Sequence, residues 1–167
     1  MWRFVMNEFS IRSMISSDID VVWAINQENV PAVGEETVEV LSELFAMSTI
    51  SLVAEVGKEV VGFCMVLSPQ TTYRSPNYLY FCERFEDFIY LDRVAVTSGF
   101  QGWGIGAAMY RKVEQLTDSS LFVLEVNTKP RNEGSLRFHT REGFELLEEV
   151  ETRPGKVVGF MMKKLKG

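Results

Sequence analysis

Three glycines at alternate positions, Gly102, Gly104 and Gly106, constrain the fold more than any other feature of the sequence. They follow an apolar, β-branched run over residues 88–96, a composition that favours a strand. After them, apolar residues recur at spacings of three and four from Ile105 to Leu116, which is typical of an amphipathic helix. Glycines let a backbone approach a ligand closely, and a helix start offers unpaired N–H groups to an anion. The sequence therefore predicts a strand, a phosphate-binding loop and a helix, and with them a phosphorylated cofactor.

The composition is that of a globular protein and argues against several classes of function. The 167 residues fit one domain, which we expect to span residues 1–167. A net charge of −6 argues against nucleic-acid binding, because phosphate backbones need a basic surface. No apolar run approaches the ~20 residues of a membrane span, and residues 1–9 are too short and interrupted for a signal peptide. Cys64 and Cys82 make no disulfide framework, and no Cys/His cluster has metal spacing, so we expect a cytoplasmic protein without a metal or a membrane contact.

Periodicity and turn signals divide the chain into strands and helices. Strand patterns cover residues 9–13, 51–56, 59–67, 88–96, 121–126, 144–151 and 157–165. Helical patterns begin at residues 16–18 and end before Pro31, and recur over residues 35–47, 105–118 and 132–143. In the last of these, Asn132 is the expected cap and Gly143 the expected C-terminal glycine. This order mixes hairpins with helical crossovers, so it predicts an α/β fold with a sheet of mixed direction. Residues 69–87 form the least regular part, a long loop that we expect to cover a substrate.

Two motifs resemble the GNAT superfamily of N-acetyltransferases. Residues 101–106, QGWGIG, match the Q/R-x-x-G-x-G/A acyl-CoA motif, and the strand before them ends in the V-x-V usual in that family. Downstream, a second set matches N-x-x-[AS]-x-x-[FY]-Y-x-x-x-G-F, with His139 where a Tyr is usual: Asn132, Ser135, Phe138, Gly143 and Phe144. The order of elements fits the family from end to end. The resemblance implies a mixed, centrally splayed β-sheet of about seven strands flanked by four helices.

The resemblance also implies acetyl-CoA as co-substrate and a set of residues that hold it. Backbone N–H groups of residues 101–106 would bind the CoA pyrophosphate, and the backbone of Val94 and Val96 would pair with the pantetheine arm. Asn132 and Ser135 would line that arm from the other side. The expected cofactor-binding residues are Val94, Ala95, Val96, Gln101, Gly102, Trp103, Gly104, Ile105, Gly106, Ala107, Asn132, Ser135 and Phe138.

Acetyl transfer needs a base for the amine and benefits from a proton donor for the leaving thiolate. Glu125 is the favoured base, because Leu124-Glu125-Val126 resembles the L-E-V strand of ribosomal-protein N-acetyltransferases in this family. Asp92 is the alternative base, or else an ion-pair partner of Arg93. His139 is the favoured acid, because an unperturbed imidazole with a pKa of ~6.5 can donate a proton near neutrality. The competing interpretations are a surface carboxylate for Glu125 and a structural histidine for His139.

We therefore predict an acetyltransferase that moves an acetyl group from acetyl-CoA to an amine acceptor by direct attack. The acceptor would be a small molecule or a peptide, and the family resemblance also makes a homodimer possible. Neither cysteine lies in a nucleophile motif, which argues against a covalent enzyme intermediate. One alternative is a CoA-binding sensor that keeps the fold without turnover. Another is a nicotinamide enzyme, since Gly102, Gly104 and Ala107 also satisfy G-x-G-x-x-[GA].

Overall fold

Seven strands form one mixed sheet in the part of the chain that the structure, a computed structural model, describes: residues 8–165. The order across the sheet is β1-β2-β3-β4-β5-β7-β6. β1 runs antiparallel to β2, β4 parallel to β5, and β7 antiparallel to both β5 and β6. The strands are β1 (Ser10–Ser13), β2 (Ile50–Val56), β3 (Glu59–Leu67), β4 (Ile89–Val96), β5 (Leu121–Lys129), β6 (Glu145–Arg153) and β7 (Lys156–Lys164). The predicted α/β class and the mixed sheet are confirmed.

Five α-helices accompany these strands within residues 8–165, one more than predicted. They are α1 (Ile19–Glu28), α2 (Val38–Met47), α3 (Pro76–Cys82), α4 (Ile105–Leu116) and α5 (Glu133–Arg141). The additional helix is α3, which lies in the segment predicted as loop. It begins with Pro76 at its first turn, where a missing N–H costs nothing, and it buries Tyr78, Tyr80 and Phe81. None of these helices is long and apolar enough to cross a membrane.

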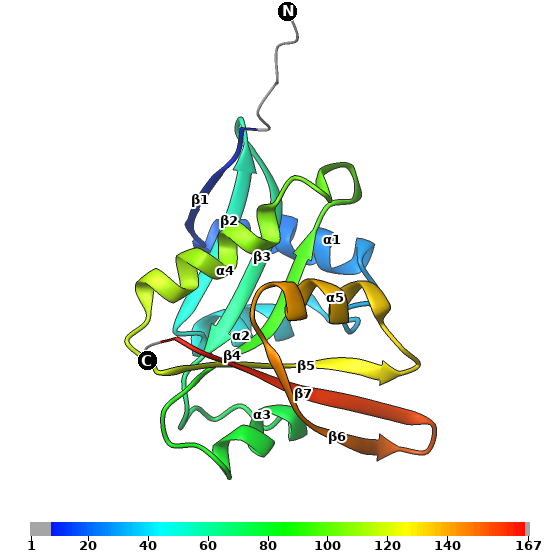
Figure 1. The fold of residues 1–167 in the computed structure, drawn as a ribbon. Helices are drawn as coiled ribbons and strands as arrows, with labels where there is room; N and C mark the ends of the chain where they lie inside the picture. The colour runs from blue at the N-terminus through cyan, green and yellow to red at the C-terminus, as the bar shows by residue number, and fades with distance from the viewer. Residues whose placement is uncertain (1–7, 166–167) are drawn as a thin grey trace, which may run out of the picture. The chain divides into compact units, whose positions relative to one another are not determined.

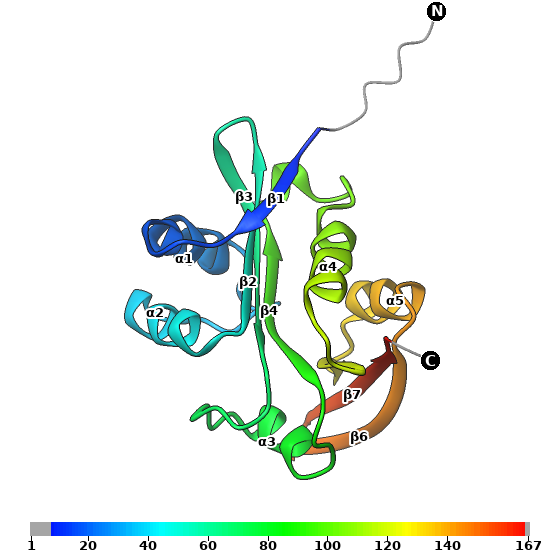
Figure 2. The same ribbon diagram turned by 90° about the vertical axis from the view of Figure 1, so that its left-hand side faces the viewer.

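The contacts of the described chain group it into two compact units, and a single domain over residues 1–167 stays a prediction. The first unit contains β1, β2, most of β3, the end of β4, and the helices α1, α2 and α4. Figure 2 shows α1 and α2 on one side of β2 and β3, with α4 on the other side. Apolar residues at helical spacing, such as Ile105, Met109 and Val113 of α4, are buried against the strands. Residues 1–7, which bear on the prediction of no signal peptide, lie outside the described residues.

The second unit contains the start of β4, the strands β5, β7 and β6, and the helices α3 and α5. Figure 1 shows α3 and α5 on opposite sides of β5 and β7. Alternation along β5 explains which side chains face each helix. Phe122 meets Phe144 edge to face beside α5, whereas Glu125 pairs in register with Phe160, on which Tyr80 of α3 stacks at 3.7 Å. Glu125 therefore points to the α3 side of the sheet.

The parallel ladder between β4 and β5 is short. It joins Ile89 to Phe122 and Tyr90 to Val123. Asp92 and Glu125 are the next residues on the same face of each strand, and they lie beyond these pairs. The family resemblance implies such a splayed centre. Asp92 and Glu125 therefore lie where backbone pairing between β4 and β5 stops.

Candidate functional site

The glycine loop in the first unit has the backbone geometry of an anion site. Gly102 and Gly104 both adopt φ of 83°, a left-handed conformation that strains any other residue. α4 begins at Ile105, so its first N–H groups have no carbonyl four residues earlier within the helix. Within the connection, the ring of Trp103 lies 4.9 Å from that of Phe100 in an edge-to-face contact. These features agree with the expectation that residues 101–107 hold an anionic group.

The end of β4 is held to the loop that follows it. The carbonyl of Val96 accepts hydrogen bonds from Gln101 Nε2 at 3.1 Å and from Asn29 Nδ2 at 3.2 Å. Ala95 is buried, while Val94 and Val96 keep partial exposure. Gln101 thus contributes its side chain to shaping the loop, a role that the motif alone does not predict.

The residues predicted on α5 belong to the second unit and serve first to build that helix. Asn132 is the N-cap, and its Oδ1 accepts from the N–H of Ser135 at 3.2 Å, as the sequence predicts. Gly143 ends the segment with φ of 96°, which also confirms the predicted C-terminal glycine. Phe138 is partly exposed. Contacts of Asn132, Ser135 and Phe138 with a pantetheine arm stay predictions.

Glu125 lies at the centre of a polar cluster on the α3 side of the sheet. Its carboxylate accepts from the Tyr90 hydroxyl, at 2.8 Å to Oε2 and 3.0 Å to Oε1, and from Asn77 Nδ2 at 3.0 Å to Oε1. Burial raises the pKa of Glu125 to about 7, and the negative charge of Asp92 adds to the rise. The hydrogen bonds from Tyr90 and Asn77 oppose it, because they favour the ionised form. Glu125 is not fully enclosed, so the group can exchange a proton near neutral pH.

Asp92, the alternative base, joins the same cluster through a second tyrosine. Tyr73 donates its hydroxyl to Asp92 Oδ1 at 2.6 Å. The ring of Tyr78 lies 5.5 Å from the ring of Tyr73 and 5.5 Å from that of Tyr90, so three tyrosines connect the two carboxylates. Arg93 contacts Glu36, Asn26 and the carbonyl of Gly34, and its ion pair with Asp92 stays a prediction.

His139 lies in an environment that disfavours proton donation. It is 5% exposed, and its ring packs edge to face against Phe138 and Phe144. Its Nδ1 is 2.8 Å from the carbonyl oxygen of Ser135, which only accepts, so Nδ1 carries the proton and Nε2 is an acceptor. Burial lowers the pKa of His139 to about 4. The ring is therefore neutral at pH 7, and an acid role for His139 stays a prediction with this geometry against it.

The segment expected to cover a substrate is more ordered than predicted. Tyr80 and Phe81 are buried against Phe160. The guanidinium of Arg84 lies over the Tyr80 ring, 3.5 Å from its centre, so a side chain of the protein itself occupies this aromatic face. The Asp87 carboxylate accepts from the N–H and the hydroxyl of Ser120. Most of these side chains therefore hold the segment in place.

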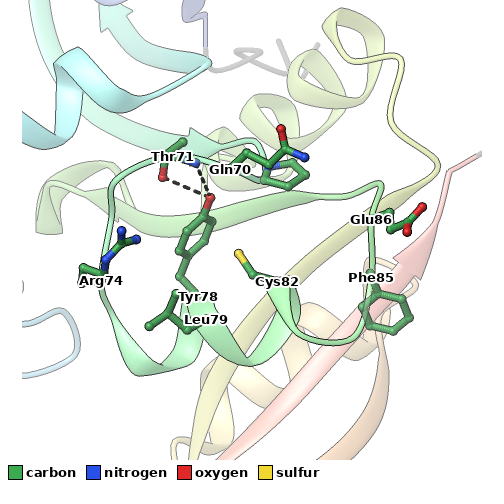
Figure 3. Close-up of a pocket in the computed structure, with 9 residues that line it drawn as sticks. Gln70, Thr71, Arg74, Tyr78, Leu79, Cys82, Phe85 and Glu86 are labelled. Atoms are coloured by element: carbon green, nitrogen blue, oxygen red, sulfur yellow. Dashed lines mark hydrogen bonds between the residues drawn. The ribbon is translucent and has the colours of Figure 1, made fainter.

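A cavity of about 530 Å³ opens between residues 69–74 and α3 (Figure 3). Tyr78 shapes its wall, since its hydroxyl donates to the Ser68 carbonyl at 2.6 Å and accepts from Thr71 Oγ1 at 3.0 Å. The α3 residues Leu79 and Cys82 face this cavity. Asn77 is not among its lining residues, so α3 carries the cavity wall and the Glu125 contact on different faces.

The sequence did not predict a place in the Glu125 cluster for three of its members: Asn77, Tyr73 and Tyr90. The position of Tyr90 could have been inferred from the sequence, because it lies two residues before Asp92 and so shares a face of β4 with it. No sequence pattern indicates the positions of Asn77 and Tyr73, because these positions depend on α3. Among residues 8–165 there is no group of three His, Cys, Asp or Glu side chains that could hold a metal ion.

Comparisons with known proteins agree with this architecture. A family model described as acetyltransferase (GNAT) family matches residues 19–144. Ard1 from Thermoplasma volcanium is 19% identical with a TM-score of 0.77, over 95% of this chain and 99% of that one. The ribosomal-protein-S18-alanine N-acetyltransferase from Escherichia coli is 13% identical with a TM-score of 0.73, over 96% of each chain. The yncA protein from Salmonella typhimurium, solved with its cofactor acetyl-CoA, is 16% identical with a TM-score of 0.71, over 96% of this chain and 95% of that one. At these identities the likeness shows a shared fold, and a comparison with curated proteins gives no match.

Proposed function

The chain belongs to the acetyltransferase (GNAT) family, and from that premise we propose that it transfers the acetyl group of acetyl-CoA to an amine, with Glu125 as the general base. The observation that carries the proposal is the Glu125 cluster. A carboxylate that is hydrogen-bonded by Tyr90 and Asn77, with a pKa of about 7, can take a proton from an ammonium group and pass it to water.

The glycine loop supplies the proposed cofactor site. Left-handed Gly102 and Gly104 and the free N–H groups at the start of α4 suit a diphosphate. Val94 and Val96 would bind the pantetheine arm through their backbone, and Asn132, Ser135 and Phe138 would contact it from α5. The side chains of Trp103 and Gln101 help to shape the loop, through Phe100 and the Val96 carbonyl, while their backbone amides belong to the proposed cofactor site.

The proposed reaction is a direct attack. Glu125 removes a proton from the ammonium group, the neutral amine attacks the thioester carbon, and the C–S bond breaks to release CoA thiolate. The new amide nitrogen loses its second proton to the thiolate or to water. The thiolate is a tolerable leaving group without an acid, since the pKa of an ordinary thiol is ~8.5. Asp92, with its Tyr73 hydrogen bond, keeps a negative charge near Glu125 and stays the alternative base.

The negative charge around Glu125 favours an acceptor that carries an ammonium group. Glu125 and Asp92 form an acidic cluster that attracts an ammonium group, and the protein as a whole carries −6. One structural relative is named a ribosomal-protein-S18-alanine N-acetyltransferase, so peptides with an N-terminal alanine join polyamines and amino acids as test acceptors.

The test is a thiol-release assay with acetyl-CoA and this panel of amines. We expect turnover with at least one acceptor, and a loss of at least a hundredfold in kcat for Glu125→Gln at pH 8 with an unchanged affinity for acetyl-CoA. The matched control is Glu149→Gln, an exposed carboxylate on β6, which should retain activity. Full activity in Glu125→Gln would refute the base assignment. Acetyl-CoA binding without thiol release on any amine would favour the sensor alternative.

A further inference from the structure

We propose that Asn77 on α3 is a positioning residue that holds the Glu125 carboxylate as a hydrogen-bonded anion and so sets the lowest pH at which acetyl transfer proceeds. This inference rests on the proposed function, because it assumes that Glu125 acts as the base. It adds a residue from α3, a helix that neither the glycine-loop motif nor the motif around Asn132 contains.

The contact between Asn77 and Glu125 is direct and has an ordinary hydrogen-bond length. Asn77 Nδ2 donates to Glu125 Oε1 at 3.0 Å, across 48 positions of sequence. Tyr90 donates to the same carboxylate from β4, so donors from two elements fix its orientation. Donors on a carboxylate stabilise its ionised form, which opposes the effect of burial. Without the amide, the burial and the neighbouring charge would act against the Tyr90 hydroxyl and the backbone N–H of Glu125 itself.

In the described part of the chain, the groups next to Glu125 come from β4, α3 and β7. β4 contributes Tyr90 and Asp92, α3 contributes Asn77, and β7 places the uncharged Phe160 opposite in register. Tyr73 from the segment before α3 acts indirectly, through its hydrogen bond to Asp92. Asp92 is the nearby like charge, and the amide of Asn77 is a donor that can be removed without a change of charge.

α3 offers a matched control on its other face. Leu79 lies two residues from Asn77 in the same helix, and its side chain lines the cavity shown in Figure 3. Leu79→Ala therefore disturbs the packing of α3 and leaves the Asn77–Glu125 hydrogen bond intact. An effect shared by both variants would come from the helix, whereas an effect of Asn77 alone comes from its amide.

The experiment measures kcat/KM for the amine against pH in the wild type and three variants. The wild type should lose activity below a pH of about 7. Asn77→Leu, similar in volume and without a donor, should move this acid limb up by about one pH unit, because a hydrogen bond to a charged group is worth about that much. At pH 6 this is about a tenfold loss, with less than a twofold change at pH 9. Asn77→Asp should move the limb further up, and Leu79→Ala should leave it in place.

A fourth variant should shift the acid limb in the opposite direction. Asp92→Asn removes the neighbouring charge and keeps an acceptor for Tyr73, so it should move the acid limb to lower pH. The Glu125 carboxyl can also be followed by carbon-13 NMR in glutamate-labelled protein, with Glu125→Gln to assign its signal. Its titration should move with the kinetic limb in each variant.

The outcomes separate the two proposals. If Asn77→Leu leaves both the kinetic limb and the Glu125 titration unmoved, the positioning role is wrong while the base assignment stands. If Asn77→Leu shifts the titration but not the kinetic limb, or if Asp92→Asn abolishes activity at every pH, the base assignment itself is wrong. Parallel upward shifts in Asn77→Leu and Leu79→Ala would also overturn the role of the amide.

Discussion

Burial acts in opposite directions on Glu125 and His139, because it disfavours the charged form of each. It raises the pKa of the carboxyl to about 7 and lowers the pKa of the imidazole to about 4. The Glu125 carboxyl can therefore bind and release a proton near neutral pH, as a base must. The His139 imidazole is a neutral ring that packs between Phe138 and Phe144. The same physical cause therefore favours the predicted role of Glu125 and disfavours the predicted role of His139.

His139 should also make the fold sensitive to acid. Its pKa is ~6.5 in an unfolded chain and about 4 in the folded protein, so the unfolded state binds a proton first as the pH falls. Stability is therefore lost progressively below a pH of ~6.5. Between pH 7.5 and pH 5 the loss assigned to this residue is about 2 kcal/mol.

Replacement of His139 by Phe, which keeps a ring between Phe138 and Phe144, should remove that loss. We expect the free energy of unfolding of His139→Phe, measured in urea, to improve relative to the wild type by about 2 kcal/mol between pH 7.5 and pH 5. A difference between variant and wild type that is the same at both pH values would contradict the buried, neutral histidine. The acetyl-transfer rate of the same variant at pH 8 tests the acid role, which predicts a large loss of kcat.

Local residue chemistry explains why some positions were predictable. Asn132 followed by Ser135 is a capping signal that acts within four residues, and it is confirmed. Gly143 is needed for a left-handed turn at a helix end, and it is also confirmed. By contrast, the burial of His139 depends on Phe144 and the strands beneath it, which no local pattern reports.

Among the elements, those with strong periodicity or a hairpin turn were predicted well, and α3 was missed. Seven residues, PNYLYFC, are too short to show helical periodicity, and the aromatics among them also favour strands. β5 is longer than predicted, since it continues to Lys129 through pairing with β7. Both differences come from contacts between distant segments. They matter for function, because α3 supplies the Asn77 contact to Glu125.

The left-handed backbone of the glycine loop can be tested by a substitution at Gly104. Gly104→Ala adds a methyl group that meets no atom within 4 Å, so any effect comes from the backbone at φ of 83°. A left-handed alanine costs about 1–2 kcal/mol, which either strains the loop or turns its amides away from the ligand. We expect the dissociation constant for acetyl-CoA, measured by calorimetry, to rise about tenfold.

Gly99→Ala is the control for this variant. Gly99 lies in the same connection, its added methyl group also meets no atom within 4 Å, and it does not have a left-handed φ. Its affinity for acetyl-CoA should stay within twofold of the wild type. Equal losses in both variants, or none in Gly104→Ala, would speak against the loop as the cofactor site.

At the scale of the whole molecule, the chain divides its chemistry between two compact units. One contains the glycine loop and the start of α4, and the other contains Glu125, its tyrosines and α3. β4 belongs to both, with Tyr90 and Asp92 in one unit and Val94 and Val96 in the other. The order of strands and helices was predictable from the chain because it follows from local patterns and connection rules.

The central claim is that the backbone amides of residues 101–107 bind the diphosphate of acetyl-CoA. The most direct measurement is a titration of nitrogen-15-labelled protein with acetyl-CoA, followed through its backbone amide signals, with NADP as the competing ligand. If the loop binds the diphosphate, the amides of residues 102–107 should show saturable shifts with acetyl-CoA and none with NADP. Unshifted signals from these residues at saturating acetyl-CoA, or the same shifts with NADP alone, would contradict it.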